Sequence, residues 1–410
     1  MGDAKSNRLR FASAVSDAPV TADAQRQVLG ALSTQLDGHK VDLVIVFVTM
    51  HHGAALKQIC EELQAALQPR VIVGCSCSGV IGVRRELQEE PGLSVLAGVM
   101  PGAALQGFSY EQIDWPAVMD APSALRDTID LSGDPNDTGD GPRAIFLLAD
   151  PFSTPMVRLL PAFGSAFGDV PVIGGLASGA AESGRNRLVL NGVEMRDGAV
   201  GVAIGGRIDV QTTVSQGCRA VGEPMVITRS RRHVVQELGG RNPLMALQHM
   251  VARLDPGDRE LIQHNGLHVG RVINEYKSRF GKGDFLIRNM IGVDADEGYL
   301  AIGDTRVRTG QTIQFHLRDA RSAEDDLRMM LAAQQVHGEA AGALLFSCTG
   351  RGTNLFDYED ADAMMVHDAL GDVPLAGFFC AGEIGPIGGQ SHLHGHTACL
   401  AVFRESGVSG

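Results

Sequence analysis

Three runs of continuously apolar residues, each of strand length, recur along the chain: Asp42–Thr49, Ala144–Asp150 and Ala343–Thr349. A strand that is apolar at nearly every position is buried on both faces, as in a layered α/β sheet. The three runs therefore predict three buried strands in similar surroundings.

A glycine-containing segment follows each run, and the two glycines in each segment have the same spacing. The pairs are Gly74/Gly79 in Val71–Gly79, Gly174/Gly179 in Pro171–Gly179 and Gly377/Gly382 in Pro374–Gly382. A further apolar run comes after each segment, at Leu93–Val99, Gly198–Ile204 and Thr397–Phe403. The pattern predicts a threefold internal repeat of strand, helix, strand, glycine loop and strand.

The helix is clearest in the first copy, where apolar residues recur at helical spacing: Leu56, Ile59, Cys60, Leu63 and Leu67. Similar patterns predict helices near 155–167, 323–336 and 359–370. A helix that links two strands favours parallel pairing, while the third strand of each unit is expected to return antiparallel. The predicted class is α/β, with mixed β-sheets and layered helices built from these pseudo-repeats in two halves.

Two stretches depart from this repeat. Residues 117–142 have turn chemistry without an apolar period, which predicts a mobile surface loop. Residues 205–340 form an insert with a helical pair near 243–264 and a strand meander through 285–291, 299–303 and 311–317. We therefore predict two domains, residues 1–212 with two repeats and residues 213–410 with the insert and the third repeat.

Composition narrows the choice of partners and compartment. The 410 residues carry a net charge of −13, and no basic run is longer than Arg229–His233, so nucleic acid is not an expected partner. No apolar run reaches the roughly 18 residues of a membrane span, and the first ten residues lack a secretory signal. Seven scattered cysteines do not form a disulfide framework, which indicates a reducing cytoplasm. No membrane partner is expected.

Several motifs together resemble FIST proteins, whose name abbreviates F-box and intracellular signal transduction. The C-terminal motifs are Phe346–Leu355, Pro374–Pro386 and Leu393–Thr397, with Gly217–Pro224 and Ile287–Gly292 further upstream. The stretch from Phe11 to Ile204 resembles the paired N-terminal domain of the family. The resemblance covers nearly the whole chain.

This resemblance implies a cytoplasmic sensory module that binds small ligands such as amino acids. Ten residues before the first match are too few for an F-box, so a ubiquitin-ligase role is not expected. The primary hypothesis is a sensory protein that is not an enzyme, needs no cofactor, and passes its signal to a separate partner protein.

The C-terminal glycine segment supplies the candidate ligand site. Glycine loops bring backbone N–H groups close to an anion, and three such loops can converge. Arg351 between two glycines is suited to hold a carboxylate, or alternatively pairs internally with Glu383. The predicted ligand-binding residues are Arg351, Glu383, His394, Asn354, Asn289, Cys348, Gly350, Gly352 and Gly382.

Other kinds of site remain open as alternatives. His392, His394 and His396 alternate, so on one strand they would share a face as in a metal site, but Gly395 interrupts that strand and no metal is expected. Cys380 or Cys348 with His394 would suit a thiol hydrolase or transferase. A protein-interaction scaffold is the third hypothesis and predicts a broad apolar surface patch. Arg318, Asp319 and Arg321 are expected to form a solvated or helix-capping cluster, with Ser322 as N-cap.

Overall fold

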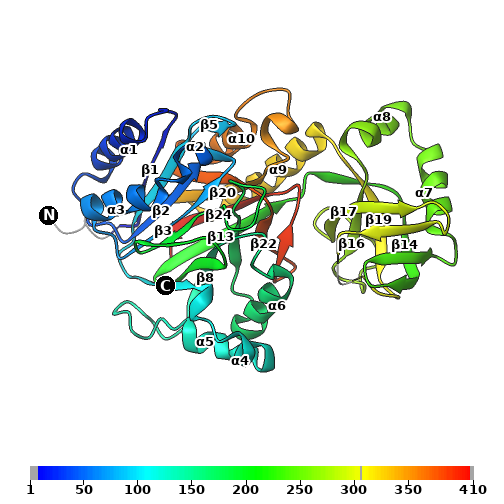
Figure 1. The fold of residues 1–410 in the computed structure, drawn as a ribbon, viewed down its shortest axis with the longest axis horizontal. Coiled ribbons are helices and arrows are strands. Elements are labelled where there is room, and N and C mark those ends of the chain that lie inside the picture. Colours follow the sequence, from blue (N-terminus) through cyan, green and yellow to red (C-terminus); the bar gives the residue numbers. More distant parts are fainter. Residues whose placement is uncertain (1–7, 305–306, 407–410) are drawn as a thin grey trace. The chain divides into compact units, whose positions relative to one another are not determined.

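The computed structural model describes residues 8–304 and 307–406. The strands of this part of the chain form three six-stranded sheets and one closed barrel (Figure 1). These residues divide into two compact units. The layered unit holds the three sheets and comprises the chain up to Val214, Arg328–Leu393 and the part from Thr397 on. The barrel unit comprises Ser215–Leu327 and His394–His396. The predicted mixed α/β class is confirmed.

The two compact units are not the same division as the two domains predicted from the sequence. The predicted domain boundary between residues 212 and 213 remains a prediction. The described part of the chain begins at residue 8. Most of the first ten residues, which were expected to lack a secretory signal, therefore lie outside the described residues. Within that described part, no helix is both long and apolar enough to cross a membrane.

Each sheet of the layered unit combines strands from distant parts of the chain. In spatial order, the first contains β1 (Arg10–Ser16), β6 (Leu93–Val99), β2 (Leu43–Thr49), β3 (Val71–Cys77), β10 (Leu188–Leu190) and β11 (Val193–Met195). The second contains β23 (Gln390–His394), β22 (Glu383–Ile387), β9 (Val172–Leu176), β8 (Pro142–Ala149), β12 (Ala199–Gly206) and β7 (Ala103–Ser109). The third contains β13 (Ile208–Ser215), β24 (Ala398–Glu405), β20 (Gly342–Cys348), β21 (Leu375–Cys380), β4 (Gly79–Gly82) and β5 (Arg85–Gln88).

One parallel strand pair lies inside each sheet. The pairs are β2–β3, β8–β9 and β20–β21, and the strands β6, β12 and β24 pair antiparallel with β2, β8 and β20. Both orientations agree with the predictions from sequence. The connecting helices are α3 (Leu56–Leu67), α6 (Met156–Phe167) and α10 (Ala361–Leu370), close to the predicted bounds.

The hairpin after each glycine segment leaves its own sheet and completes another one. β4–β5 follows β3 but pairs with β21, β10–β11 follows β9 but pairs with β3, and β22–β23 follows β21 but pairs with β9. Each sheet thus receives a hairpin from another copy of the strand–helix–strand unit. The three sheets are interlocked in a cycle and cannot separate without breaking strand pairing.

Glycine is required where the interlocked strands meet. Gly377 lies between Leu345 of β20 and Ile81 of the incoming hairpin, and a Cβ built on it would lie 1.9 Å from the Leu345 carbonyl oxygen. The corresponding distances are 2.6 Å from Gly74 to the Val46 oxygen and 1.9 Å from Gly174 to the Leu147 oxygen. A methyl group at any of the three positions would overlap the neighbouring backbone.

The inner faces of the sheets share one aromatic core. Phe47 of β2, Phe146 of β8 and Phe346 of β20 are fully buried, one from each sheet. The ring centroids of Phe146 and Phe346 lie 5.8 Å apart and those of Phe47 and Phe346 lie 6.4 Å apart. Such contacts add to the burial of apolar area and hold the three sheets together.

The prediction of a mobile loop at 117–142 is wrong. This region contains α4 (Trp115–Asp120) and α5 (Leu125–Thr128), and its side chains Val118, Leu125, Ile129 and Leu131 are buried. Two helices of six and four residues are too short to show a helical period in the sequence. The remaining helices of the layered unit include α1 (Thr21–Leu36) and α2 (Met50–Gly53).

The barrel unit contains the three strands and the helical pair that were predicted for the insert, but the prediction that the strands form one meander is wrong, because the strand at 312–318 pairs with those at 218–231 and 268–272 and not with that at 299–302. Its strands follow the order β14 (Cys218–Arg231), β15 (Val234–Leu238), β18 (Tyr299–Ile302), β17 (Phe285–Asp294), β16 (His268–Val272) and β19 (Thr312–Arg318). The pair consists of α7 (Pro243–Ala252) and α8 (Pro256–Asn265). The helix expected at 323–336 is α9 (Ala320–Gln334), which begins in the barrel unit and ends in the layered unit.

Replacing Gly377 by alanine should destabilise the protein strongly, because the new methyl group overlaps the Leu345 carbonyl. We expect a loss of about 3 kcal/mol in unfolding free energy, measured by denaturant titration. Gly164→Ala is the matched control, since this glycine lies inside α6 with no atom within 4 Å of a built Cβ. The control should gain up to about 1 kcal/mol from helix propensity. Equal stability of the two variants would contradict the account of the interlock.

Candidate functional site

The three glycine loops of the layered unit meet, as the sequence hypothesis proposed. The backbone N–H of Ser78 donates to the Ser178 hydroxyl at 3.0 Å, and the two hydroxyl oxygens lie 3.2 Å apart. The Ser178 hydroxyl donates to the carbonyl of Phe379, next to the third loop. Because Ser178 gives its proton to Phe379, the Ser78 hydroxyl is the donor between the two serines.

Arg351 is buried beside this junction and does not face solvent. Its side chain has no exposed surface, and its Nε and Nη2 donate to the two Asp362 carboxylate oxygens at 2.8 and 2.6 Å. The Ser347 hydroxyl donates to the same carboxylate at 2.6 Å, and Phe356 lies against the guanidinium at 5.4 Å. The alternative of an internal ion pair holds, but the partner is Asp362 of α10 and not Glu383.

Glu383 is also fully buried, at the start of β22. Its Oε2 accepts hydrogen bonds from the Thr397 hydroxyl at 2.8 Å and the Thr397 N–H at 3.1 Å. Burial raises the pKa of Glu383 to about 8, against the lowering effect of Thr397, Cys348 and Arg351. Burial and the charge of Asp362 likewise raise the pKa of Glu86 to about 8. These raised pKa values favour the protonated form of both glutamates at neutral pH, and the ion pair of the cluster is the one between Arg351 and Asp362.

The neighbouring predicted residues shape the loop after β20. The Asn354 side-chain amide donates to the Thr349 carbonyl at 2.9 Å, and Gly350 lies in the turn. Gly352 has a left-handed φ of 57°, and a Cβ there would lie 2.0 Å from Gln88 Oε1. Gly382 packs against Leu176 and Leu393, each 3.0 Å from a built Cβ. These contacts support a structural role for the loop.

Asn289 and His394 both belong to the barrel unit. The histidine that contacts Asn289 is His396, whose Nε2 lies 2.7 Å from the Asn289 Oδ1. His392 and His394 lie on β23, but His396 follows it with a left-handed φ of 64°, so the three do not share one strand face. Among the described residues no cluster of three His, Cys, Asp or Glu side chains is arranged to hold a metal ion.

All seven cysteines lie within the described residues, in buried positions, and none of them forms a disulfide bond. Burial raises the pKa of Cys380 well above its ordinary value, and the nearby Glu383 adds to this effect. The thiolate is the nucleophilic form, so an active thiol needs the opposite shift. This environment disfavours Cys380 as the nucleophile of a thiol hydrolase or transferase.

A cavity of about 190 Å³ lies in the barrel unit and was not predicted from sequence. Its lining consists of Gln216, Cys218, Arg219, Ala220, Phe280, Gly281, Lys282, Gly283, Phe285, His316 and Asp326. Burial lowers the pKa of His316 to about 4, so this imidazole is neutral at physiological pH. The cavity thus combines aromatic walls, a neutral histidine and both signs of charge.

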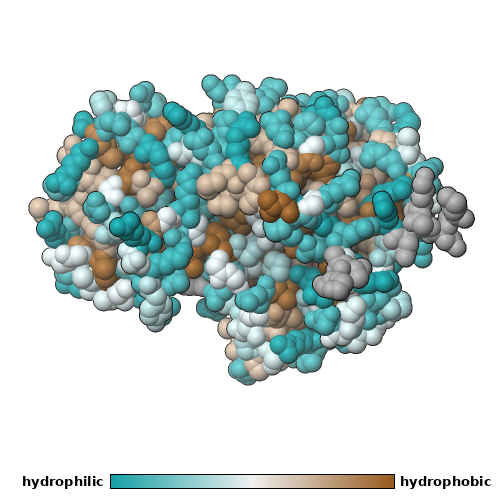
Figure 2. All heavy atoms as spheres, turned by 180° about the vertical axis from the view of Figure 1, so that it is seen from behind, coloured by the Kyte–Doolittle hydropathy of each residue, from teal (hydrophilic) through white to brown (hydrophobic). Residues whose placement is uncertain are grey.

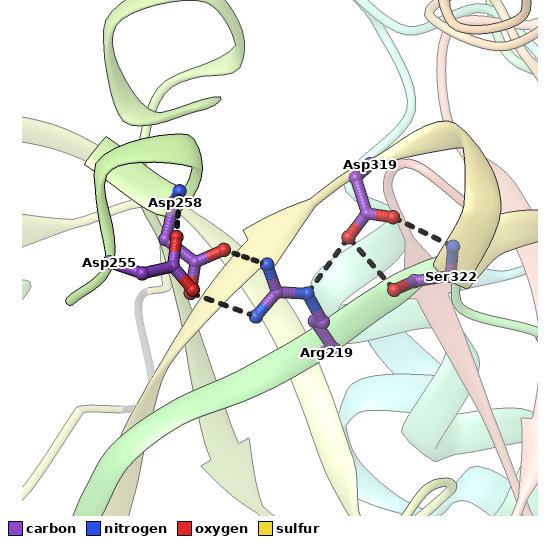
Figure 3. A network of polar contacts seen from close by, with 5 residues as sticks. All are labelled: Arg219, Asp255, Asp258, Asp319 and Ser322. Atoms are coloured by element: carbon purple, nitrogen blue, oxygen red, sulfur yellow. Dashed lines mark hydrogen bonds and ion pairs between the residues drawn. The ribbon is translucent and has the colours of Figure 1, made fainter. Parts of the chain in front are cut away.

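Arg219 lines the cavity and is held in place by two aspartates, whose contacts Figure 3 shows. Its Nε donates to Asp319 at 3.0 Å, and its two terminal nitrogens both donate to Asp258. Asp319 also caps α9 by accepting from the Ser322 N–H at 2.8 Å, so the predicted N-cap at Ser322 is wrong by three residues. With both sides of its guanidinium engaged, Arg219 is not the receptor for an anionic ligand.

Lys282 and Asp326 form the adaptable polar part of the cavity. The Lys282 Nζ lies 3.7 Å from Asp326 Oδ1, longer than a hydrogen bond, and the lysine side chain is 43% exposed. Asp326 is nearly buried and holds the Ser215 hydroxyl and the Gln216 N–H with its other oxygen, Oδ2. The sequence contains one signal that could have identified Asp326. It precedes Met330 by four residues, so this acidic residue lies on the apolar stripe of its helix, where a charged side chain needs a polar partner.

These features define a mixed α/β protein with interlocked sheets and a separate barrel unit that contains a small polar cavity. Residues 42–241 match the model of the FIST N domain, and residues 244–386 match that of the FIST C domain. The chain belongs to the FIST family, whose domains are associated with sensing in signal transduction.

Curated relatives and a solved structure add little about chemistry. The uncharacterized protein Rv0628c of Mycobacterium tuberculosis is 35% identical over 97% of this chain and 100% of its own length. The uncharacterized protein Mb0898c of Mycobacterium bovis is also 35% identical, over 97% of this chain and 99% of its own length. A crystal structure of cyanuric acid hydrolase from A. caulinodans aligns with 96% of this chain and 99% of its own, at 10% identity and a TM-score of 0.33.

The Glu383→Gln variant should change how stability depends on pH. The folded state keeps a proton on Glu383 up to a pKa of about 8, whereas the unfolded state loses it near 4.5, so this residue costs increasing stability as pH rises between these values. Relative to the wild type, the variant should therefore become more stable as pH is raised from about 5 to about 8. Urea titrations across this range measure the difference, and a constant difference would contradict the assignment.

Alkylation of the native protein by N-ethylmaleimide near neutral pH should be slow at every cysteine. Burial limits access to every thiol, so labelling should become fast only after unfolding in guanidinium. Burial also raises the pKa of five of the thiols, those of Cys60, Cys75, Cys77, Cys380 and Cys399. Peptide mass spectrometry identifies each labelled site. Rapid reaction of Cys380 or Cys348 alone would restore the thiol-enzyme hypothesis.

Proposed function

We propose that this FIST protein is a cytoplasmic sensory protein that binds an amino acid or a similar small charged metabolite in the cavity of its barrel unit. The observation that carries the proposal is the pairing of Lys282 with Asp326 in the lining of a cavity of about 190 Å³. This volume is below the ~300–1,000 Å³ of drug-sized sites, so it suits a metabolite of few atoms.

The lining is complementary to a zwitterion. A ligand ammonium group would meet Asp326 Oδ1, and the ligand carboxylate would meet the Lys282 ammonium. Phe280 and Phe285, whose ring centroids are 5.8 Å apart, supply apolar surface for the remaining atoms. Charge-assisted hydrogen bonds of this kind are stronger than neutral ones, especially in a partly desolvated cavity.

That the nine residues chosen from the sequence contact a ligand remains a prediction. The burial of Arg351 and Glu383 instead supports a role in fixing the loop after β20, because an enclosed guanidinium paired with Asp362 is costly to expose. We therefore place the proposed ligand in the barrel unit, which still lies within the predicted C-terminal domain.

The proposed protein is not an enzyme, and its output passes to a separate signalling partner. Burial raises the pKa of the Cys380 thiol, which disfavours the thiolate that a thiol hydrolase or transferase would need. For the interaction-scaffold alternative, Figure 2 shows hydrophobic residues in several small groups among hydrophilic ones on the face drawn, without a broad patch. Neither nucleic acid nor a membrane is part of the proposal.

Isothermal titration with a panel of the twenty amino acids should find saturable binding. Lys282→Met and Asp326→Asn should each weaken the binding about tenfold or more, because each removes one charge that the zwitterion pairs with. Lys277→Met is the matched control on the same loop, since Lys277 pairs with Asp284 and does not line the cavity. No saturable binding, or equal affinity of all three variants, would sink the proposed function.

A further inference from the structure

The chain passes from one unit to the other at several positions, and Asp326 forms hydrogen bonds that connect two of them. One passage lies between Val214 and Ser215, a second between Leu327 and Arg328, and a short third one involves His394–His396. Asp326 stands one residue before the second passage and accepts from the Ser215 hydroxyl at 2.8 Å and the Gln216 N–H at 2.9 Å. Two passages that are distant in sequence are thus held by one carboxylate oxygen, in an arrangement that we call the Asp326 clasp.

The first passage is short and has a backbone suited to a bend. Only Gln216 and Gly217 separate β13 of the layered unit from β14 of the barrel, and Gly217 has a left-handed φ of 64°. Gln216 is almost buried, and its side-chain amide donates to the Phe285 carbonyl. Changes at the clasp therefore act on a two-residue connection.

Helix α9 carries the second passage without a break. Its first residues are fixed in the barrel unit, where Asp319 pairs with Arg219 (Figure 3). Its last residue, Gln334, is fixed in the layered unit by donating to the Thr213 hydroxyl at 2.8 Å and accepting from Arg404 at 3.0 Å. A helix of 15 residues anchored at both ends transmits a displacement at one end to the other.

The same carboxylate belongs to the proposed ligand site. Oδ2 of Asp326 holds the clasp, while Oδ1 faces the Lys282 ammonium at 3.7 Å. That contact is longer than a hydrogen bond, and its lysine side is partly exposed to water whereas the aspartate is nearly buried. A ligand ammonium at Oδ1 would fix the orientation of the carboxylate, so that Oδ2 stays in place as the acceptor for Ser215 and Gln216.

We propose that Asp326 couples the cavity to the layered unit, so that an occupied cavity tightens the clasp and α9 carries this change across the second passage. The coupling rests on the proposed function for its trigger, although the clasp itself is independent of any ligand. By linkage, whatever tightens the clasp also raises affinity in the cavity.

Amide hydrogen exchange tests the coupling in two arms. In the first, the tightest-binding amino acid of the titration panel is added to the full chain, and exchange should slow about tenfold at Gln216 and at 328–334. Ser215→Ala removes one bond of the clasp but leaves Oδ1 intact, so it should keep binding within a few-fold and lose the protection at 328–334. Ser322→Ala, on the first turn of the same helix and away from the cavity lining, should behave as wild type.

The second arm needs no ligand. Lys282→Met removes the cation that faces Oδ1, so exchange at Gln216 and at 328–334 should quicken severalfold relative to the Lys277→Met control. Equal exchange in these two lysine variants, or ligand protection confined to the cavity and unchanged in Ser215→Ala, would overturn the coupling. Absence of binding in the titration would instead overturn the proposed function, and the lysine arm would still decide the role of the clasp.

Discussion

The close backbone approach at Gly74, Gly174 and Gly377 is the constraint on which the layered unit depends. At each position one strand pairs on one side with its parallel neighbour and on the other with a hairpin from another copy. A side chain there would occupy the place of a carbonyl oxygen. Three of the 51 glycines in this chain are therefore a packing requirement, which explains why one recurs at the corresponding position of each copy.

This interlock also explains why the polar groups near the third loop are enclosed. The hairpin β4–β5 pairs with β21, and its Gln88 and Glu86 accept from the N–H groups of Thr353 and Ala363, so this hairpin covers the loop that holds Arg351. Glu383 is buried where β22 pairs with β9. Burying a charge is costly unless it is paired, and Arg351 meets this condition through two hydrogen bonds to Asp362. Glu383 meets it differently, by holding its proton to a pKa of about 8. Residues that resemble an anion receptor in the sequence thus fix the loop on which they stand.

The sequence was informative where a repeating backbone pattern determines structure. Apolar runs and spaced glycines predicted the parallel pairs, the antiparallel third strands and the convergence of the loops. The exchange of hairpins was not predictable, because β4, β10 and β22 are short and pair with strands far away in the chain. The partner of Arg351 was missed for a similar reason, since Asp362 reaches it only through the placement of α10. Asp326 was overlooked because its apolar neighbours on α9 indicated a packed helix and not a polar clasp.

The proposed function belongs to the barrel unit. This unit combines a small cavity lined by charged groups with a carboxylate, that of Asp326, which also holds the connection to the layered unit. A crystal structure of the protein purified from its own cells tests this claim most directly. We expect density for a small molecule that contacts both the Lys282 ammonium and Asp326 Oδ1 and lies against the rings of Phe280 and Phe285. Ordered water alone in this cavity, or a small molecule bound beside an opened Arg351, would contradict it.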